Sequence, residues 1–405
     1  MTTFKDLGVA ESILSALDKI GFTTPTPIQE QAIPPALDGC DILGSAQTGT
    51  GKTAAFGIPL ISRLIANPTG MAIVMTPTRE LAAQVLSTLH PLLLNHRNIK
   101  TALLIGGDSM GKQMDQLRQR PRIIVGTPGR INDHLERRSL NLSEAGFLVL
   151  DEMDRMLDMG FGVQIDRILK FMPRQRQTLM FSATIPAAIV KVSQKYLVNP
   201  KRIAIGSSHT PLPKIRQENV PVTEGDKYNQ LMGQLYERQG SIIVFVKTKH
   251  GAKRLAEKLS RDDQKADAIH GNLAQNKRTK VIDAFRQKKY RVLVATDVAA
   301  RGLDIPHIEH VINYDLPQCP EDYIHRIGRT GRAGAEGNAI NLLAPSDSQK
   351  WREICKLMNP GEKMPDAPRG QRREEGRKQP SRYKKNRNFR HSRGNQSGER
   401  QQVYR

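Results

Sequence analysis

The chain has 405 residues and a formal net charge of +22, from 62 Lys and Arg against 40 Asp and Glu. This length predicts two or three domains, each large enough to bury a core of its own. Hydrophobic residues at 38% and charged residues at 25% exclude a fibrous protein and a wholly disordered one. No apolar run reaches the roughly 18 residues of a membrane span, and the opening MTTFKDLGVA lacks the pattern of a secretory signal. We therefore expect neither a membrane span nor a secretory signal.

The cysteine content bears on the compartment of the protein, and the net charge bears on the kind of partner that it binds. Cys40, Cys319 and Cys355 lack the spacing of metal ligands, so we expect reduced thiols in a cytoplasmic protein. The excess of positive charge favours a polyanionic partner, with nucleic acid as the first candidate. Aromatic residues make up only 5% of the chain, which favours a partner bound through phosphates over one read by stacked bases.

Short apolar runs rich in Val, Ile and Leu alternate with longer amphipathic segments from about residue 40 to residue 345. This alternation predicts strands of parallel sheets that helices cover on both faces. A first short strand begins the run 41–53, and further strands are predicted at 72–78, 101–107, 122–128, 147–152, 178–184, 241–248, 291–297, 310–316 and 338–344.

Composition divides the chain into two α/β domains and a tail. Residues 206–217, GSSHTPLPKIRQ, contain Gly, Ser and two prolines without periodicity, so we interpret them as a linker between domains at 1–205 and 218–360. Residues 361–405 hold 14 Lys and Arg and 5 Asp and Glu, a net charge of +9, and few apolar residues. We expect this tail to be disordered and to bind nucleic acid.

The strongest sign of nucleotide binding is DILGSAQTGTGKT at 41–53, a strand followed by a Gly-rich turn and a helix. Backbone N–H groups of such a turn, at a helix N-terminus, cradle phosphate oxygens. Lys52 would contact the β- and γ-phosphates, and the Thr53 hydroxyl would bind Mg²⁺. The strict pattern has Gly where this chain has Ala46, so a Gly-rich loop without a ligand remains an alternative on this motif alone.

A second sign is FLVLDEMD at 147–154, an apolar strand that ends in adjacent carboxylates. Asp151 could hold Mg²⁺ through water, and Glu152 could orient the attacking water. The alternative is a pair of acidic residues on a solvated loop. Because the pair ends a buried strand in the same predicted domain as Lys52, the catalytic interpretation is favoured.

The second predicted domain supplies positive charge in YIHRIGRTGRAG at 323–334. Arg326, Arg329 and Arg332 follow one another at intervals of three residues, with glycines between them. This spacing can direct a planar cation at a transferring phosphoryl group that another domain holds. A solvated basic face or a contact to a nucleic-acid backbone is the alternative.

Taken in order, the motifs over roughly residues 4–345 resemble those of the DEAD-box ATP-dependent RNA helicases of superfamily 2. The matching runs are GFTTPTPIQ, AQTGTGKT, PTRELA, TPGR, SAT, VFVKT, ATDVAARGLDI and HRIGRTGR. Ala46 is the family's own usual residue, which removes the departure noted above. The carboxylate motif reads Asp-Glu-Met-Asp, with Met153 where the family has Ala, and this bears on local packing and not on the reaction class. The short N-terminus, compact domains and basic tail are similar to the bacterial RhlE-like subgroup.

The resemblance implies a role for each matching residue. Those implied to be catalytic are Lys52, Asp151, Glu152, Arg329 and Arg332, the two arginines as fingers from the second domain. ATP contacts would come from Phe4, Gln29, Ala46, Gln47, Thr48, Gly49, Thr50, Gly51, Lys52, Thr53 and Asp304, with Thr53 and Asp151 holding Mg²⁺ largely through water. RNA contacts would come from Pro77, Thr78, Arg79, Gly107, Thr127, Pro128, Gly129, Arg130, Gln275, Arg278, Thr296 and Asp297. Coupling of hydrolysis to strand separation would involve Asp154, Ser182, Ala183, Thr184 and His325.

The fold that the resemblance implies is a pair of RecA-like α/β domains, with ATP and Mg²⁺ in the cleft between them. RNA would lie across both domains and be held through sugar and phosphate groups, its 2′-OH groups distinguishing it from DNA. Closure of the cleft would bend one strand and unwind a short duplex locally, and hydrolysis would reopen the cleft. Ribosome-assembly and RNA-decay proteins are the protein partners that the resemblance suggests.

Two other functions fit part of the pattern. An RNA chaperone with a silent ATPase is disfavoured by the intact Lys52, by Asp151 and Glu152, and by the two arginine fingers. A DNA-directed translocase of the same superfamily is disfavoured by the run GFTTPTPIQ and by the SAT form of the coupling motif. The sequence therefore favours an RNA helicase without identifying the RNA it acts on.

Overall fold

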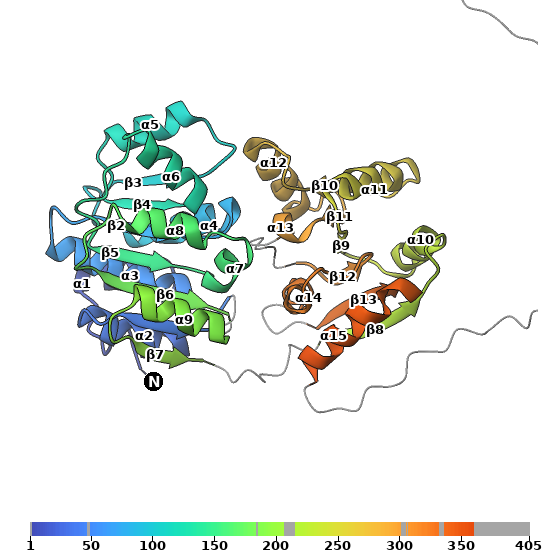
Figure 1. The fold of residues 1–405 in the computed structure, drawn as a ribbon, viewed down its shortest axis with the longest axis horizontal. Helices are drawn as coiled ribbons and strands as arrows, with labels where there is room; N and C mark the ends of the chain where they lie inside the picture. The colour runs from blue at the N-terminus through green and yellow to red at the C-terminus, as the bar shows by residue number, and fades with distance from the viewer. Residues whose placement is uncertain are drawn as a thin grey trace, which may run out of the picture. The chain divides into compact units, whose positions relative to one another are not determined.

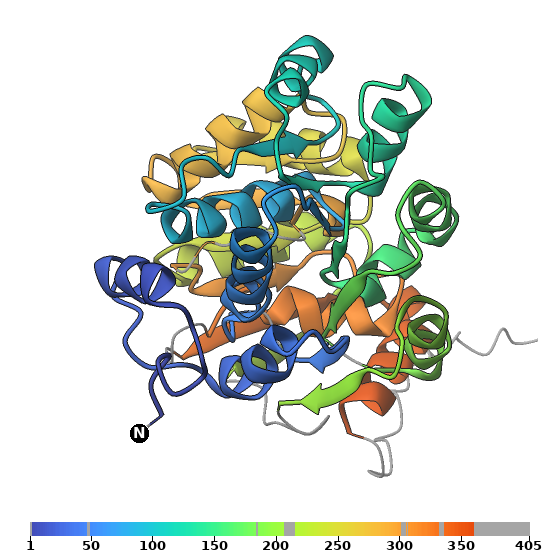
Figure 2. The same ribbon diagram turned by 90° about the vertical axis from the view of Figure 1, so that its left-hand side faces the viewer.

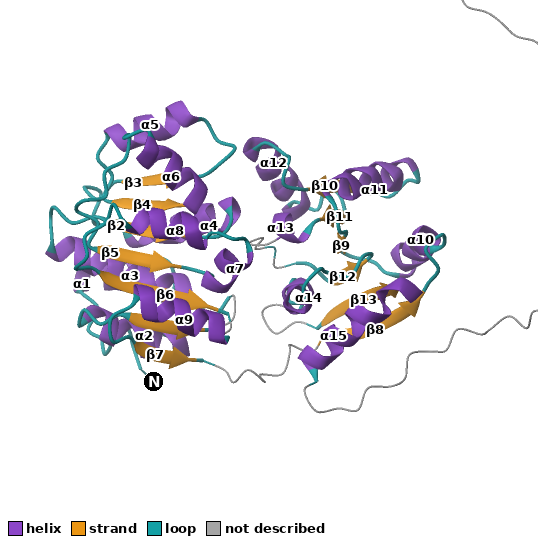
Figure 3. Cartoon of the chain, in the orientation of Figure 1, coloured by secondary structure: helices purple, strands orange, loops and turns teal. Residues whose placement is uncertain are grey.

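The structure is a computed structural model that describes residues 2–46, 49–183, 185–205, 215–300, 305, 307–331 and 336–359 (Figure 1). Its regular elements are the strands of two parallel sheets and the helices that pack against them (Figure 3). The predicted tail and residues 206–214 of the predicted linker lie outside the described residues. Within the described part of the chain, no helix is both long enough and apolar enough to cross a membrane.

The first sheet has seven parallel strands in the order β3-β4-β2-β5-β6-β1-β7. The strands are β1 (Ile42–Ser45), β2 (Ala72–Met75), β3 (Thr101–Leu104), β4 (Ile123–Gly126), β5 (Phe147–Leu150), β6 (Gln177–Ser182) and β7 (Lys201–Ala204). Every residue of β2, β4 and β5 is buried, as expected for strands that helices cover on both faces. β1 pairs with β6 so that their last residues, Ser45 and Ser182, lie side by side.

Helices cover both faces of this sheet. They are α1 (Glu11–Lys19), α2 (Pro27–Leu37), α3 (Lys52–Ala66), α4 (Arg79–Leu92), α5 (Met110–Arg118), α6 (Pro128–Glu136), α7 (Met153–Asp158), α8 (Gly162–Leu169) and α9 (Ala187–Tyr196). Apolar side chains of α1–α4 form one core cluster, and those of α6–α9 form another. Successive strand residues point to opposite faces, so Val74 joins the first cluster and Ile73 the second. Figure 2 shows the blue helices and the green helices on opposite sides of the sheet.

The second sheet has six parallel strands in the order β10-β11-β9-β12-β13-β8. The strands are β8 (Ile215–Pro221), β9 (Ile242–Phe245), β10 (Ala266–Ile269), β11 (Val292–Ala295), β12 (His310–Asn313) and β13 (Gly337–Leu343). The helices are α10 (Lys227–Glu237), α11 (Lys249–Arg261), α12 (Gln275–Arg286), α13 (Asp297–Ala300), α14 (Pro320–Ile327) and α15 (Ser348–Met358), with a 3-10 helix, η2 (Pro345–Asp347). One core cluster includes side chains of α12–α15, and the cluster on the other face includes those of α10 and α11.

The predicted fold class is confirmed, and each predicted strand overlaps an observed one. The strands that the sequence did not reveal are β7, β8 and β10, and all three lie at sheet edges. These three strands carry no continuous apolar run, since a strand at a sheet edge can leave side chains exposed. In β8, for example, the residues between Ile215 and Val220 are exposed. This strand begins at Ile215, so residues 215–217 of the predicted linker belong to the second sheet.

Candidate active site

Parallel strands all end at the same edge of a sheet, so the loops that follow them meet there. In the first sheet the predicted phosphate loop follows β1, Asp151 follows β5, and Ser182 ends β6. β6 lies between β5 and β1. The topology therefore places three motifs side by side that lie far apart in the sequence.

Side chains of α2 and of the residue before it hold the phosphate loop. Thr26 donates its hydroxyl to Thr50 O at 2.8 Å, and Gln29 donates Nε2 to Gly51 O at 3.0 Å. Gly51 has a φ of +93°, and a Cβ added there would lie 2.4 Å from Gln29 Nε2. The left-handed backbone and this close approach together require glycine at the position.

Lys52 begins α3, and its residue is only 6% exposed. Its Nζ donates to Ala46 O at 2.7 Å, so the buried amino group bridges the two ends of the loop. Gly49, inside the loop, has a φ of +86°. The predicted ATP contacts at Gln47 and Thr48 lie outside the described residues.

Asp151 follows β5 directly and is 3% exposed. Its Oδ1 accepts a hydrogen bond from Glu152 N at 3.0 Å. Burial raises the pKa of Asp151 to about 7, and the positive charge of Lys52 opposes that rise. A carboxylate in this setting lacks a full counter-charge, which a divalent cation would supply.

The residues at this edge fit Mg²⁺ better than a metal with an all-protein ligand set. Thr53 lies in the first turn of α3, and its hydroxyl, like the carboxylate of Asp151, is the oxygen ligand that Mg²⁺ prefers. No group of three or more His, Cys, Asp or Glu side chains among the described residues could hold a metal ion. Mg²⁺ in nucleotide sites is held by one or two protein oxygens together with phosphates and water, and these residues suffice for that.

An ion pair that the sequence did not reveal holds Glu152. Arg155 Nη1 donates to Glu152 Oε2 at 2.9 Å, and the two side chains are 2% and 4% exposed. Glu152 also has a left-handed backbone, with φ 54° and ψ 52°, which costs energy in a residue other than glycine. The ion pair therefore fixes the direction of the carboxylate. The available signal was spacing, since residues three apart on a helix meet on one face.

The predicted coupling residues connect the carboxylate motif to the phosphate loop. Ala183 N donates to Asp154 Oδ2 at 3.0 Å, and Ala46 N donates to Ser182 O at 3.2 Å. The end of β6 is therefore bonded to the phosphate loop on one side and to the carboxylate motif on the other. Thr184, the third residue of the SAT motif, lies outside the described residues.

The predicted RNA contacts of the first domain share one edge of the sheet. Pro77 and Thr78 lie in the loop between β2 and α4. Thr127, Pro128 and Gly129 lie where β4 passes into α6. Because β2 and β4 are neighbours, these two junctions are adjacent.

A cluster of guanidinium groups lies at these junctions. Arg79 packs against the Gly106–Gly107 backbone, and a Cβ added to Gly107 would lie 2.2 Å from Arg79 Nη1. Burial lowers the pKa of Arg79, and the positive charges of Arg278 and Arg130 lower it further, while the negative charge of Glu80 opposes this shift. Like charges held this close favour an anion such as a phosphate group.

Gln275 and Arg278 contact Glu80 of α4. Arg278 Nε donates to Glu80 Oε1 at 2.6 Å, and the two side chains are 5% and 8% exposed. Gln275 Nε2 donates to the same oxygen at 3.3 Å. Arg278 also donates to His270 O and Ala299 O, at 3.1 and 3.3 Å. Much of this guanidinium group is thus engaged by protein, and the RNA contacts expected at both residues stay predictions.

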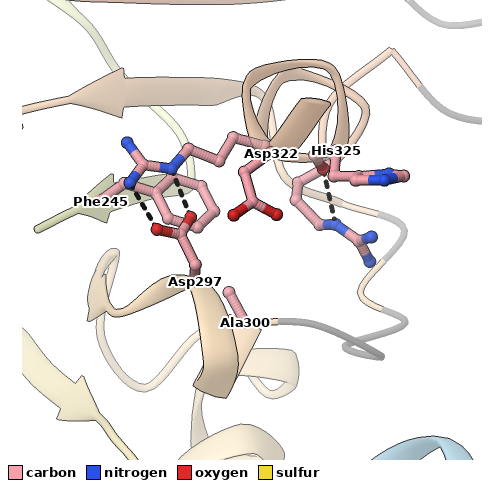
Figure 4. Close-up of a pocket in the computed structure, with 7 residues that line it drawn as sticks. Phe245, Asp297, Ala300, Asp322 and His325 are labelled. Carbon is pink, nitrogen blue, oxygen red and sulfur yellow. Dashed lines mark hydrogen bonds and ion pairs between the residues drawn. The ribbon is translucent and has the colours of Figure 1, made fainter. Parts of the chain in front are cut away.

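Asp297, Arg326 of α14 and Arg329, which follows the end of that helix, line a small hollow in the second domain (Figure 4). Arg326 donates Nε and Nη2 to the two carboxylate oxygens of Asp297 at 2.5 and 2.7 Å, and its guanidinium lies 4.8 Å from the Phe245 ring centroid. Arg329 is 5% exposed and donates Nε to His325 O at 3.1 Å. Asp297, which was expected to contact RNA, is therefore the ion-pair partner of Arg326 in α14.

The other predicted site residues are placed less informatively. Phe4, an expected ATP contact, is 3% exposed and belongs to a core cluster of the first domain. Thr296 is buried directly after β11. Asp304 and Arg332 lie outside the described residues.

Two protein-family models match the chain: DEAD/DEAH box helicase over residues 26–192, and helicase conserved C-terminal domain over residues 226–334. The DEAD-box ATP-dependent RNA helicase CshA of Bacillus cereus is 44% identical over 356 residues, which cover 87% of this chain and 68% of that protein. The chain belongs to the DEAD-box ATP-dependent RNA helicases. CshA of Bacillus subtilis is 43% identical to this helicase over 354 residues, which cover 87% of this chain and 72% of that protein.

A solved structure of S. cerevisiae Dbp5 bound to RNA and ADP BeF3 matches this helicase with a TM-score of 0.80 and 33% identity. The match covers 89% of this chain and 95% of that chain. The implied pair of RecA-like domains is therefore confirmed. As a member of this family, the helicase is an RNA-dependent ATPase that couples ATP hydrolysis to RNA unwinding.

Met153 generates the first prediction. Its side chain is fully buried in the core cluster that includes α7, and it offers no group to the reaction. We predict that Met153→Ala leaves a cavity that lowers the free energy of unfolding by roughly 2–5 kcal/mol. The same change should alter RNA-stimulated turnover by less than about tenfold, or about 1.4 kcal/mol in the barrier. Urea unfolding and steady-state ATPase kinetics check the two parts.

Met159 at the end of α7 is the control, because it is partly exposed and Met159→Ala should cost less stability. A folded Met153→Ala protein without ATPase activity would contradict the prediction.

Proposed function

We propose that this helicase binds ATP at the phosphate loop after β1 and hydrolyses it with the carboxylates after β5. The observation that carries the proposal is that Lys52 and Asp151 are both buried at the same edge of the first sheet, where β6 separates the two strands that they follow. A cation for the phosphates beside a carboxylate for the metal is the arrangement that a nucleoside triphosphate with its divalent cation requires.

Each residue then has a distinct task. Mg²⁺, held by Thr53 and through water by Asp151, would neutralise charge that develops on the phosphates. Glu152, aimed by Arg155, orients the attacking water. Arg329 supplies a positive charge to the γ-phosphate in the closed state, together with Arg332, and so stabilises the transition state.

RNA, in this proposal, is held through its sugar–phosphate backbone. The support is Arg79, which packs against the Gly106–Gly107 backbone and is subject to the positive charges of Arg130 and Arg278. Contacts to phosphates bind any sequence, so the helicase would select RNA by shape and by the 2′-OH groups. Closure around ATP and RNA would bend one strand and separate a short duplex, and hydrolysis would release it.

We also propose a cytoplasmic location and a role in ribosome assembly or RNA decay. The support is the family to which the chain belongs, together with the three scattered cysteines of the sequence, which lack the pattern of a disulfide framework. Crosslinking followed by sequencing of the bound RNA would separate the two processes, since ribosomal RNA favours the first and messenger RNA the second. The RhlE-like subgroup stays a prediction, because the relatives reported above carry the name CshA.

Loss of the phosphate cation or of the water-orienting carboxylate tests the proposed chemistry. We predict that Lys52→Ala and Glu152→Gln each reduce RNA-stimulated ATP hydrolysis by at least about 100-fold. Phosphate release at saturating RNA measures the loss, and Glu152→Gln should still bind ATP. Lys112→Ala and Glu144→Gln alter exposed residues of the same domain and serve as matched controls. Normal turnover in either folded active-site variant would refute the assignment.

A third prediction concerns Arg329. We predict that Arg329→Ala lowers turnover by about 10³–10⁵-fold, the usual cost of removing an arginine finger. The affinity for RNA without nucleotide should change little, because the finger acts in the closed state. Single-turnover hydrolysis and fluorescence anisotropy with labelled RNA measure the two effects, and Arg254→Ala on the exposed face of α11 is the control. Equal losses in RNA affinity and turnover would show that Arg329 is an RNA contact instead.

The basic tail generates a fourth prediction. Removal of residues 361–405 should weaken RNA binding and flatten the slope of log affinity against log salt concentration, because fewer counterions are released. Turnover at saturating RNA should be retained. A full-length variant with the 14 tail Lys and Arg changed to Gln should behave like the truncation, since it lacks the charge and keeps the length. An unchanged salt slope in both proteins would mean that the tail serves another partner.

A further inference from the structure

A row of asparagines crosses three neighbouring strands of the second sheet. Asn313 of β12 is in register with Asn341 of β13, and Asn341 is in register with Asn219 of β8. Hydrogen bonds of 2.8 Å join each pair of neighbouring amides. Asn313 and Asn341 are fully buried, whereas Asn219 is exposed at the sheet edge. Buried amides destabilise an apolar core unless they are hydrogen-bonded, so this asparagine row needs partners at both ends.

The asparagine row meets the arginine helix, α14, at two points. Arg326 Nη1 donates to Asn313 Oδ1 at 2.9 Å. One turn earlier on the helix, the Tyr323 hydroxyl accepts from Asn341 Nδ2 at 2.9 Å and donates to Gln217 Oε1 at 2.8 Å. Two side chains on one face of α14 are thus bonded to the adjacent strands β12 and β13.

The direction of every hydrogen bond in the row follows from the chemistry of arginine. A guanidinium group has donors and no acceptor, so Asn313 must turn Oδ1 toward Arg326 and Nδ2 toward Asn341. Asn341 then accepts through Oδ1, and its Nδ2 is directed to Asn219 Oδ1 and the Tyr323 hydroxyl. Both buried amides donate and accept in this one arrangement. If either buried amide were flipped, an N–H donor would face another N–H donor. The hydrogen bonds of the row can therefore form only when α14 presents Arg326 to Asn313 and Tyr323 to Asn341, which specifies a single position for the helix.

The position of α14 in turn sets that of Arg329. Arg329 N donates to Arg326 O at 3.0 Å, and Arg329 Nε donates to His325 O at 3.1 Å. Both acceptors are backbone carbonyls of α14. A shift of the helix would therefore move the Arg329 guanidinium with it.

We propose that Asn341 is a positioning residue for ATP hydrolysis, which fixes α14 against β12 and β13 and thereby places Arg329. This inference rests on the proposed role of Arg329 as an arginine finger. Asn341 acts only through Asn313 and Tyr323 and touches no reacting group. Its effect on the rate is expected to be large because a misplacement of about 1 Å can cost about 100-fold in a reaction that depends on orientation.

Asn341→Leu tests the proposal, since leucine nearly keeps the volume and removes the amide. In the full-length protein we expect kcat for RNA-stimulated hydrolysis to fall at least about tenfold. KM for ATP and the affinity for RNA should change less than about threefold, a split that a general loss of structure would not produce. Asn338→Leu on the same strand is the matched control, because Asn338 points to the opposite face and should leave kcat unchanged.

A double-mutant cycle with Arg329→Ala tests the route of the effect. If Asn341 acts through Arg329, Asn341→Leu should lower kcat less than about twofold in the Arg329→Ala background. Thermal unfolding checks that each protein is folded at the assay temperature. Asn341→Ser, which keeps a donor and an acceptor, is the second variant, with a smaller loss of kcat expected.

Equal losses from Asn341→Leu in both backgrounds, or normal kcat in both Asn341 variants, would overturn the positioning role. These results leave the proposed function intact, provided that Arg329→Ala alone is slow. Normal kcat in Arg329→Ala alone would instead refute the arginine finger, and with it the inference drawn from it.

Discussion

Parallel pairing forces the carboxyl ends of all strands in a sheet onto one edge, and the residues to which we assign the chemistry of this helicase lie at that edge in both domains. In the first sheet, β1 is followed by the phosphate loop and β5 by Asp151, with β6 between them. In the second sheet, Asp297 follows β11. The next strand, β12, ends in Asn313, which accepts a hydrogen bond from Arg326. The strands themselves are buried and apolar, so they serve as a rigid support from which short polar segments extend.

Charged groups at these edges are buried, and a buried charge destabilises a protein unless it is paired. The structure pairs Glu152 with Arg155, Arg278 with Glu80, and Arg326 with Asp297. Each pair also restrains the geometry, because its two side chains come from different turns of the chain or from different elements. Asp151 differs from these paired groups, because burial raises its pKa and the positive charge of Lys52 offsets this rise only in part. A divalent cation held there, as proposed above, would correct that imbalance.

Neutral polar groups perform the corresponding task where charge would be too costly. The Gln29 side chain donates a hydrogen bond to the carbonyl of Gly51. The backbone at the end of β6 joins Ala46 to the carboxylate motif. The asparagine row joins β12 and β13 to α14. In all three cases a hydrogen bond with a defined donor and acceptor fixes a segment to which we assign a role in catalysis. Directional bonds of this kind fix orientation, which non-directional apolar packing does not.

The sequence by itself determined the fold class, most strands and the nature of the reaction, because apolar runs, glycine-rich turns and strand-terminal carboxylates are local patterns. It did not reveal β7, β8 and β10, since an edge strand has one neighbour and little apolar surface to bury. Nor did it reveal that Arg278 pairs with Glu80, or that Asn313, Asn341 and Asn219 share a register. The asparagine contacts depend on which strands are neighbours, and the order β10-β11-β9-β12-β13-β8 differs from the order along the chain, whereas Arg278 and Glu80 come from α12 and α4. Only the tertiary structure decides these contacts. The hydrogen bonds join residues that lie far apart in the sequence, and their spacing along the chain does not show which of them are neighbours in space.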